Sequence, residues 1–115
     1  MYSVTPNSGP AGEALMVFIS CPDTHAEALA QQLVESRLAA CVNLVAGARS
    51  VYLWRGAVET AAETLLIAKT DATHFEALRG AVLAAHPYEL PEIVAVSISQ
   101  GHAAYLDWIR DSLNP

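Results

Sequence analysis

The sequence has few charged residues and only one lysine. Charged residues make up 16% of the 115 residues, against about 25% in a typical soluble domain. The lysine is Lys69, and the five arginines are scattered, so no cluster of positive charge is available to neutralise nucleic-acid phosphates. We therefore expect no binding to nucleic acid. A small domain with so little charge is expected to have part of its surface covered, and self-association is the simplest cover.

Cysteines are also few, and long apolar runs are absent. Cys21 and Cys41 are too few to form the disulfide framework of a small secreted domain. No basic segment followed by an apolar run opens the sequence, so we expect no secretory signal and a cytoplasmic location. No apolar run approaches the roughly 20 residues that span a bilayer, and we expect no membrane association. A phosphate-binding glycine loop, a G-x-S-x-G motif and a CxxC motif are all missing, so we expect no enzymatic activity.

The composition divides the chain into two parts. Residues 1–12 hold two prolines, two glycines and several small polar residues, which are too polar to order themselves, so they are expected to form a flexible N-terminal tail. Residues 13–115 have the length and apolar content of a single domain.

Apolar periodicity within 13–115 predicts seven elements in the order β-α-β-β-α-β-α. Strands are expected at 15–21, 41–54, 58–70 and 93–98, and helices after Pro22, after Asp71 and after Gly101. The first helix is expected to be capped by Asp23 or Thr24 and to end near residue 38, and Thr73 with Glu76 has capping-box spacing for the second. This order indicates an α+β, ferredoxin-like fold: an antiparallel sheet in the order four-one-three-two, with helices on one face and an extra C-terminal helix.

The second and third strands predict an unusually long hairpin. Gly47 interrupts the strand pattern and indicates a bulge, and Arg55-Gly56 has the length of a two-residue turn. The strands exceed the usual length of about 5–6 residues, so the tip is expected to overhang the sheet. Tyr52 and Trp54 share one face of this overhang, and a neighbouring subunit is the expected cover.

The sequence resembles the CutA family of divalent-cation tolerance proteins. The matching residues are Arg37, Ala39, Ala40, Cys41, Asn43, Ser50, Tyr52, Trp54, Gly56, Glu63, Lys69, Thr70, His86, Pro87, Tyr88, Pro91, Glu92, Tyr105 and Trp108. The resemblance implies the ferredoxin-like fold, a homotrimer built through the long hairpins, and a role in the response to metal ions. It also implies binding of a divalent metal, copper more than zinc and not needed for the fold, through Cys21 and His86. Some members carry a second histidine where this chain has Ala85.

The residues themselves leave two interpretations open for each expected metal ligand. Pro87 biases His86 toward an extended backbone, so its imidazole is aimed, either at a metal or at carbonyls of the helix end. Cys21 precedes a helix start, a position that lowers a thiol pKa, but a small buried hydrophobe is the other interpretation. Cys21 and Cys41 are expected at opposite ends of parallel strands, too far apart for a disulfide.

A polar cleft between subunits is the second expected site. Its residues are Cys41, Tyr52, Trp54, Glu63, Lys69, Tyr88 and Glu92. Lys69 is expected to pair with a carboxylate, with Glu92 the candidate, and a purely structural ion pair is the alternative. Such a cleft also fits a second function, a trimeric signalling module similar to the PII type that binds a small effector. A third hypothesis is a small enzyme that uses Glu63 or His86 as its acid–base group.

Overall fold

The computed structural model describes residues 12–115, so the predicted tail lies outside the described residues apart from Gly12. In chain order the elements are β1 (Ala14–Cys21), α1 (Asp23–Glu35), β2 (Cys41–Trp54), β3 (Ala57–Asp71), α2 (Phe75–Ala85), β4 (Glu92–Ser97) and α3 (Ala103–Leu113). The predicted element order is confirmed. No helix within residues 12–115 has the length and apolar character to cross a membrane.

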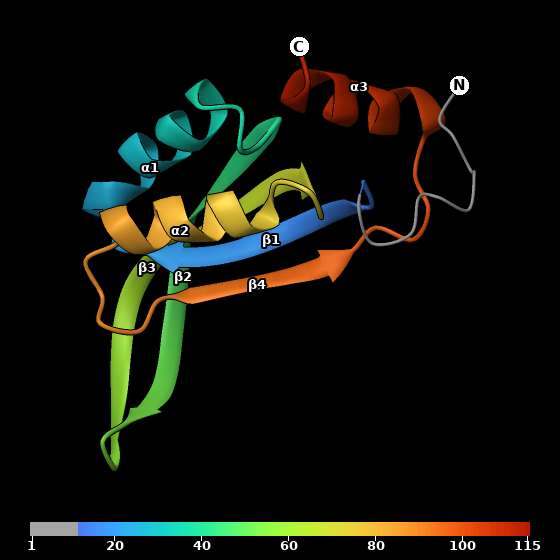
Figure 1. Ribbon diagram of the computed structural model, residues 1–115. Coiled ribbons are helices and arrows are strands. Elements are labelled where there is room, and N and C mark those ends of the chain that lie inside the picture. Colours follow the sequence, from blue (N-terminus) through green and yellow to red (C-terminus); the bar gives the residue numbers. More distant parts are fainter. Residues whose placement is uncertain (1–11) are drawn as a thin grey trace.

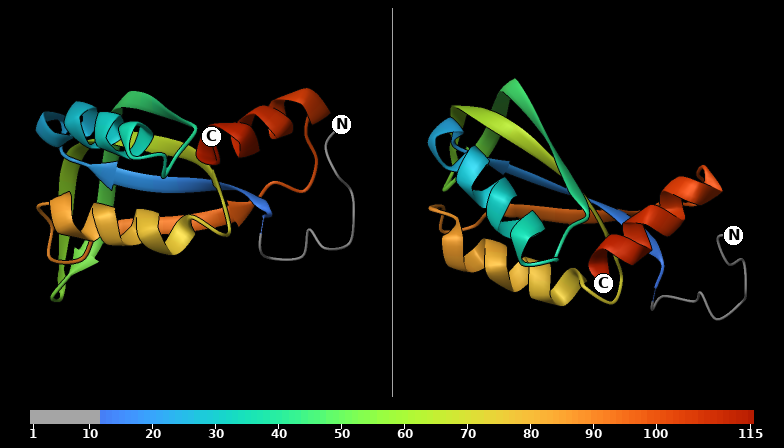
Figure 2. Two further views of the ribbon diagram at one scale, coloured as in Figure 1. Left: turned by 45° about the horizontal axis from the view of Figure 1, so that its top comes forward. Right: turned by 90° about the horizontal axis from the view of Figure 1, so that it is seen from above.

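The four strands form one antiparallel sheet in the order β2-β3-β1-β4, which confirms the predicted order read from its other edge. Helices α1 and α2 cover one face of this sheet, while α3 lies apart from them, beyond the end of the sheet where β1 begins (Figures 1 and 2). None of the three described helices covers the opposite face, which exposes apolar side chains such as Val94 and Val96 of β4.

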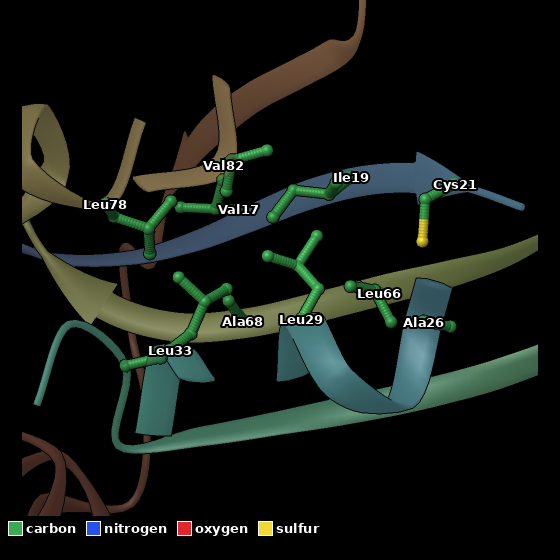
Figure 3. Packing of buried hydrophobic residues seen from close by; sticks show 11 residues of the cluster. Val17, Ile19, Cys21, Ala26, Leu29, Leu33, Leu66, Ala68, Leu78 and Val82 are labelled. Carbon is green, nitrogen blue, oxygen red and sulfur yellow. The ribbon is translucent and has the colours of Figure 1, made fainter. Parts of the chain in front are cut away.

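The main core lies between the sheet and the two helices. Val17 and Ile19 of β1 point at the helix layer, where they meet Leu33 of α1 and Leu78 of α2, and all four are fully buried (Figure 3). Burial of each such side chain stabilises the fold by about 1.5–3 kcal/mol. A smaller apolar cluster attaches α3 to the start of β1 through Ile109 and its neighbours.

The β2–β3 hairpin runs past the helices and forms an arm, so the molecule measures 48 Å along its long axis and 26 Å across. Figure 1 shows this arm extending away from the helix layer, with the turn at its tip. Arg55 and Gly56 form the turn with φ of 51° and 84°, the left-handed values of the two-residue turn that suits a twisted hairpin. The predicted bulge is also present, because the pairing register shifts between Val45 and Ala48.

The predicted cap of the first helix is wrong. Helix α1 begins at Asp23, but neither candidate side chain caps it. The carboxylate of Asp23 accepts a hydrogen bond of 2.6 Å from the Thr64 hydroxyl of β3, and the Thr24 hydroxyl lies 3.0 Å from Nδ1 of His25. The Asp23 side chain thus bonds to β3 instead of capping the helix. This is a tertiary contact, which the local sequence spacing does not reveal.

Helix α1 also ends earlier than predicted, at Glu35. Arg37 has a φ of 60°, which turns the chain out of the helix. The amides of Leu38 and Ala39 both donate to the carbonyl of Leu33, which satisfies that helix end in place of another turn.

The second helix starts at Phe75 without the predicted capping box. Its entry is held by Asp71 instead of Thr73, since the Asp71 carboxylate accepts from the backbone amide of His74 at 2.9 Å. The same oxygen lies 2.7 Å from Nδ1 of His74, so one buried carboxylate orders the whole connection.

Candidate functional site

A groove of about 750 Å³ opens where the outer half of the hairpin approaches the connection between α2 and β4. This volume falls within the range of about 300–1,000 Å³ found for small-molecule pockets. Five of the seven residues expected in a polar cleft line it, and they are Tyr52, Trp54, Glu63, Tyr88 and Glu92. Whether the groove lies between subunits stays a prediction.

The bulge in β2 decides which side chains reach the groove. Before it, Val45 lies opposite Leu65 of β3, and after it Ala48 lies opposite Glu63. Two residues of β2 therefore span one residue of β3, so the alternation of β2 changes by one position. As a result Ser50 and Tyr52 follow Val45 on the sheet face away from the helices, although strict alternation would separate them.

Glu63 is the central polar group of the groove. Only 4% of the residue is exposed. Its Oε1 accepts a hydrogen bond of 2.5 Å from the Ser50 hydroxyl, and its Oε2 accepts one of 2.8 Å from the Tyr88 hydroxyl. Neither donor carries a charge, so the carboxylate is held in place without a positive partner from the described residues.

Tyr88 responds to this arrangement. Burial, followed by the hydrogen bond to the Glu63 carboxylate and its negative charge, raises the pKa of Tyr88 to about 12. The Tyr88 hydroxyl therefore stays protonated across the physiological range and remains a donor to Glu63.

His86 connects the end of β1 to the groove. Its backbone is extended, as predicted, with φ of −80° and ψ of 137°. The amide of Tyr88 donates to Nδ1 at 3.1 Å, so the ring proton lies on Nε2, which donates to the carbonyl of Ser20 at 2.8 Å. The Ser20 hydroxyl in turn donates to Glu92 at 2.9 Å. His86 thus braces Tyr88 and Ser20, two residues that line the groove.

Cys21 lies at the same end of β1, but its environment differs from the predicted one. The residue is fully buried, with its sulfur directed toward the helix layer (Figure 3). Burial raises the pKa of the Cys21 thiol, and the charges of Glu63 and Asp23 raise it further. The expected lowering of the thiol pKa at the helix start is therefore wrong, because α1 begins with a carboxylate and the thiol is enclosed.

These positions bear directly on metal binding. Cys21 and His86 come to the same end of β1, but the thiol is enclosed in the core and both imidazole nitrogens are already hydrogen-bonded. Across residues 12–115, no group of three or more His, Cys, Asp and Glu side chains is placed to hold a metal ion. As arranged in one protomer, the two residues do not offer a ready site, so their role as metal ligands stays a prediction that requires local rearrangement.

The other two expected cleft residues lie at the opposite end of the sheet. Cys41 and Lys69 face each other across β2 and β3, level with Met16 rather than with the groove. Lys69 donates to the side-chain oxygen of Asn43, so the predicted pairing with Glu92 is wrong. Antiparallel pairing places Lys69 near the start of β1 and Glu92 near its end, which separates them by most of the strand.

Two serines that line the groove were missing from the predicted cleft, Ser20 and Ser50. Both are hydroxyl donors that hold a groove carboxylate. The signal that could have found Ser50 is simple alternation, because Ser50 lies two residues before Tyr52 on the same face of β2. No local sequence signal identifies Ser20 as a groove residue, because it is brought next to Glu92 by the pairing of β1 with β4.

Charge at the groove is mainly negative. Glu89 and Glu92 join Glu63 in its lining. The nearby positive group is Arg55 at the hairpin tip, whose guanidinium donates to both carboxylate oxygens of Glu89 at 3.0 and 3.2 Å. The same guanidinium lies 5.1 Å from the centre of the Trp54 ring.

Comparisons with known proteins agree on the family. The model of the CutA1 divalent ion tolerance protein family matches residues 15–112. A divalent-cation tolerance protein CutA from Thermus thermophilus is 47% identical over 98 residues, which cover 84% of this chain and 95% of that protein. The crystal structure of CutA from Xylella fastidiosa superposes with a TM-score of 0.86 at 43% identity, covering 89% of this chain and 99% of the other.

A third relative carries a different description. The structure of a PII-like protein CutA from a Nostoc species superposes with a TM-score of 0.82 at 32% identity, covering 87% of this chain and 97% of the other. The family match, the sequence identity and the shared fold all cover most of the chain. The chain therefore belongs to the CutA1 family of divalent ion tolerance proteins.

Proposed function

We propose that the protein is a cytoplasmic homotrimer that contributes to divalent-cation tolerance as a binding module, without enzymatic activity. The observation that carries this proposal is Glu63, a carboxylate that is 4% exposed yet lines an open groove, held there by two hydroxyl groups. Such convergent polar groups in an otherwise apolar and aromatic concavity are typical of ligand sites. The groove is therefore the proposed site of ligand binding.

Exposed apolar residues on the arm support the homotrimer. Val51, Leu53 and Val58 are 70%, 73% and 70% exposed, and they lie close together across the outer half of β2 and β3. Apolar patches of this kind mark interaction surfaces. The number of subunits comes from the resemblance to the family.

A signalling role of the PII type uses the same groove. The Nostoc relative is described as PII-like, and a module that responds to a small effector would need a pocket formed between separate elements. The groove meets that need because one wall is the arm and the other is the connection between α2 and β4. Tolerance and signalling are thus compatible within one binding module.

Copper binding by Cys21 and His86 is the second candidate function. It is favoured by the position of both residues at one end of β1, since imidazole and thiolate are suitable copper ligands. Binding requires His86 to give up its bond to the Ser20 carbonyl and Cys21 to lose its proton. We therefore expect weak uptake, with copper bound more tightly than zinc.

Native mass spectrometry of chelator-stripped protein tests both functions. We expect a trimer, and we expect Leu53→Glu to dissociate it because the substitution places a charge on the apolar arm. Stepwise copper and zinc are then added to the wild type, to His86→Ala and to the control His25→Ala, whose ring is exposed on α1. Copper uptake that His86→Ala removes would support the metal site. A monomeric wild-type protein would contradict the proposed assembly.

A further inference from the structure

We infer that the groove at Glu63 recognises a small organic ammonium ion rather than an anionic effector or a bare metal ion. This inference rests on the proposed function, in which the groove is the ligand site, and it adds the chemical class of the ligand. Three features of the groove carry it: an uncompensated buried carboxylate, a surrounding negative charge, and exposed aromatic faces.

The buried carboxylate of Glu63 requires a positively charged partner. Glu63 accepts hydrogen bonds from two neutral hydroxyls, and among residues 12–115 no lysine, arginine or histidine lies within ion-pair distance of it. A carboxylate withdrawn from water without a counter-charge destabilises the protein unless a cation reaches it. An ammonium group in the groove would provide that charge, and each oxygen of Glu63 still has a free lone pair to accept its N–H.

The rest of the lining disfavours anions. Glu89 and Glu92 repeat the negative sign of Glu63, and Arg55 is already committed to Glu89 through two hydrogen bonds. Phosphate groups need clustered positive donors, and the groove presents none among the described residues. Nucleotides and other small anions are therefore excluded from this site by charge.

Aromatic side chains select an organic cation over a metal ion. Tyr52, Trp54 and Tyr88 line the groove, and the face of an aromatic ring attracts an ammonium ion. The Arg55 guanidinium already lies 5.1 Å from the centre of the Trp54 ring, so Tyr52 and Tyr88 are the rings proposed to contact the ligand. A metal ion would need several converging ligands, but no such group of three exists across residues 12–115. Aromatic faces with one central carboxylate suit an alkylammonium instead.

Isothermal titration calorimetry of the full chain in sodium phosphate buffer tests the inference. The probes are ethanolammonium and tetramethylammonium chloride, with ATP and sodium acetate as anions and sodium chloride at matched ionic strength. We expect the ammonium probes to bind the wild type and the anions not to bind. Glu63→Gln should weaken ammonium binding at least about tenfold, because it removes the charge and keeps the shape. The control Glu27→Gln, on the exposed side of α1, should bind as the wild type does.

Assembly is followed in parallel by native mass spectrometry, which separates the possible failures. Equal binding by wild type and Glu63→Gln overturns the inference. Anion binding by an intact trimer also overturns it, but leaves the groove as the ligand site and the proposed function standing. No binding of any probe by an intact trimer overturns the inference and the ligand-binding part of the proposed function together.

If Glu63→Gln does not assemble, a second variant tests whether the groove binds ammonium ions. Glu92 is exposed, and among the described residues its side chain bonds only to Ser20, so Glu92→Gln is expected to leave the fold intact. A loss of ammonium affinity of about threefold or more in Glu92→Gln supports the inference, since it removes a second groove charge. Unchanged affinity in that variant overturns it.

Discussion

The hydroxyl of Tyr88 and the carboxylate of Glu63, 25 residues apart in the sequence, are joined by a hydrogen bond of 2.8 Å. This bond connects the segment after α2 to β3 of the long hairpin. Since those two segments form opposing walls of the groove, the bond sets the distance between them. Arg55 and Glu89 join the same two walls nearer the hairpin tip.

Removal of that hydroxyl is expected to loosen the groove. Tyr88→Phe should lower the stability by about 1–2 kcal/mol, because a buried carboxylate loses one of its two donors. Urea unfolding at fixed protein concentration measures the change. Tyr52→Phe is the matched control, since the Tyr52 hydroxyl makes no hydrogen bond among the described residues. Equal losses in the two variants would show that the bond to Glu63 contributes nothing.

Alkaline pH should destabilise the protein through Tyr88. Its folded pKa is about 12, above the value of about 10 for an unfolded chain. The unfolded state therefore loses the phenolic proton first, so stabilisation that is complete below pH 10 is lost as pH rises toward 12. Unfolding midpoints measured across this range should fall more steeply for wild type than for Tyr88→Phe. A parallel pH dependence in both proteins would contradict the assignment.

The two cysteines should differ sharply in reactivity. Cys21 is fully buried and its thiol pKa is raised, whereas Cys41 is partly exposed at the start of β2. Because the thiolate is the reactive form, a thiol reagent such as DTNB should modify Cys41 in the native protein and Cys21 only on unfolding. Cys41→Ser should abolish the native reaction, and Cys21→Ser should leave it unchanged. A fast native reaction in Cys41→Ser would show that Cys21 is accessible.

Two glycine-to-alanine substitutions should act in opposite directions. Gly56 has a φ of 84° in the hairpin turn, so an added Cβ is strained and Gly56→Ala should cost about 1–2 kcal/mol. Gly80 lies exposed within α2, where a Cβ would meet no atom within 4 Å. Gly80→Ala should therefore stabilise the protein by about 0.5–1 kcal/mol through helix propensity. Thermal unfolding of both variants measures the difference, and losses in both would refute the argument.

The fold could be read from the sequence because its signals are local and repeated. The continuous apolar run of β1, the periodicity of α1 and the Arg55-Gly56 turn each specify one element, and the order of elements then restricts the topology. The helix starts could not be read so well. Asp71 bonds to the amide of His74 with ordinary capping spacing but two residues before the predicted Thr73, while Asp23 bonds to Thr64 on another strand.

The groove was predictable in part for the same reason. Tyr52 and Trp54 share a face by simple alternation, and Glu63 follows from the pairing of the hairpin. Lys69 was assigned to the same site because a lone lysine usually has a carboxylate partner. Its hydrogen-bond partner is Asn43 of β2, the strand that pairs with β3. The separation of Lys69 and Glu92 along the sheet follows only from the strand register.

The extra residue in β2 lies between the inner half of the strand, which closes the core, and the outer half, which lines the groove. Deletion of Gly47 would leave one residue of β2 opposite Thr64, so Ala48 could still pair with Glu63, and Ser50 and Tyr52 would keep their side of the arm. Residues 41–45 would keep their pairing with β3, so the inner half of the sheet would still close the core. The inner pairing and the outer pairing of β2 are thus specified separately, and the bulge marks the boundary between the part that folds the protein and the part that lines its groove.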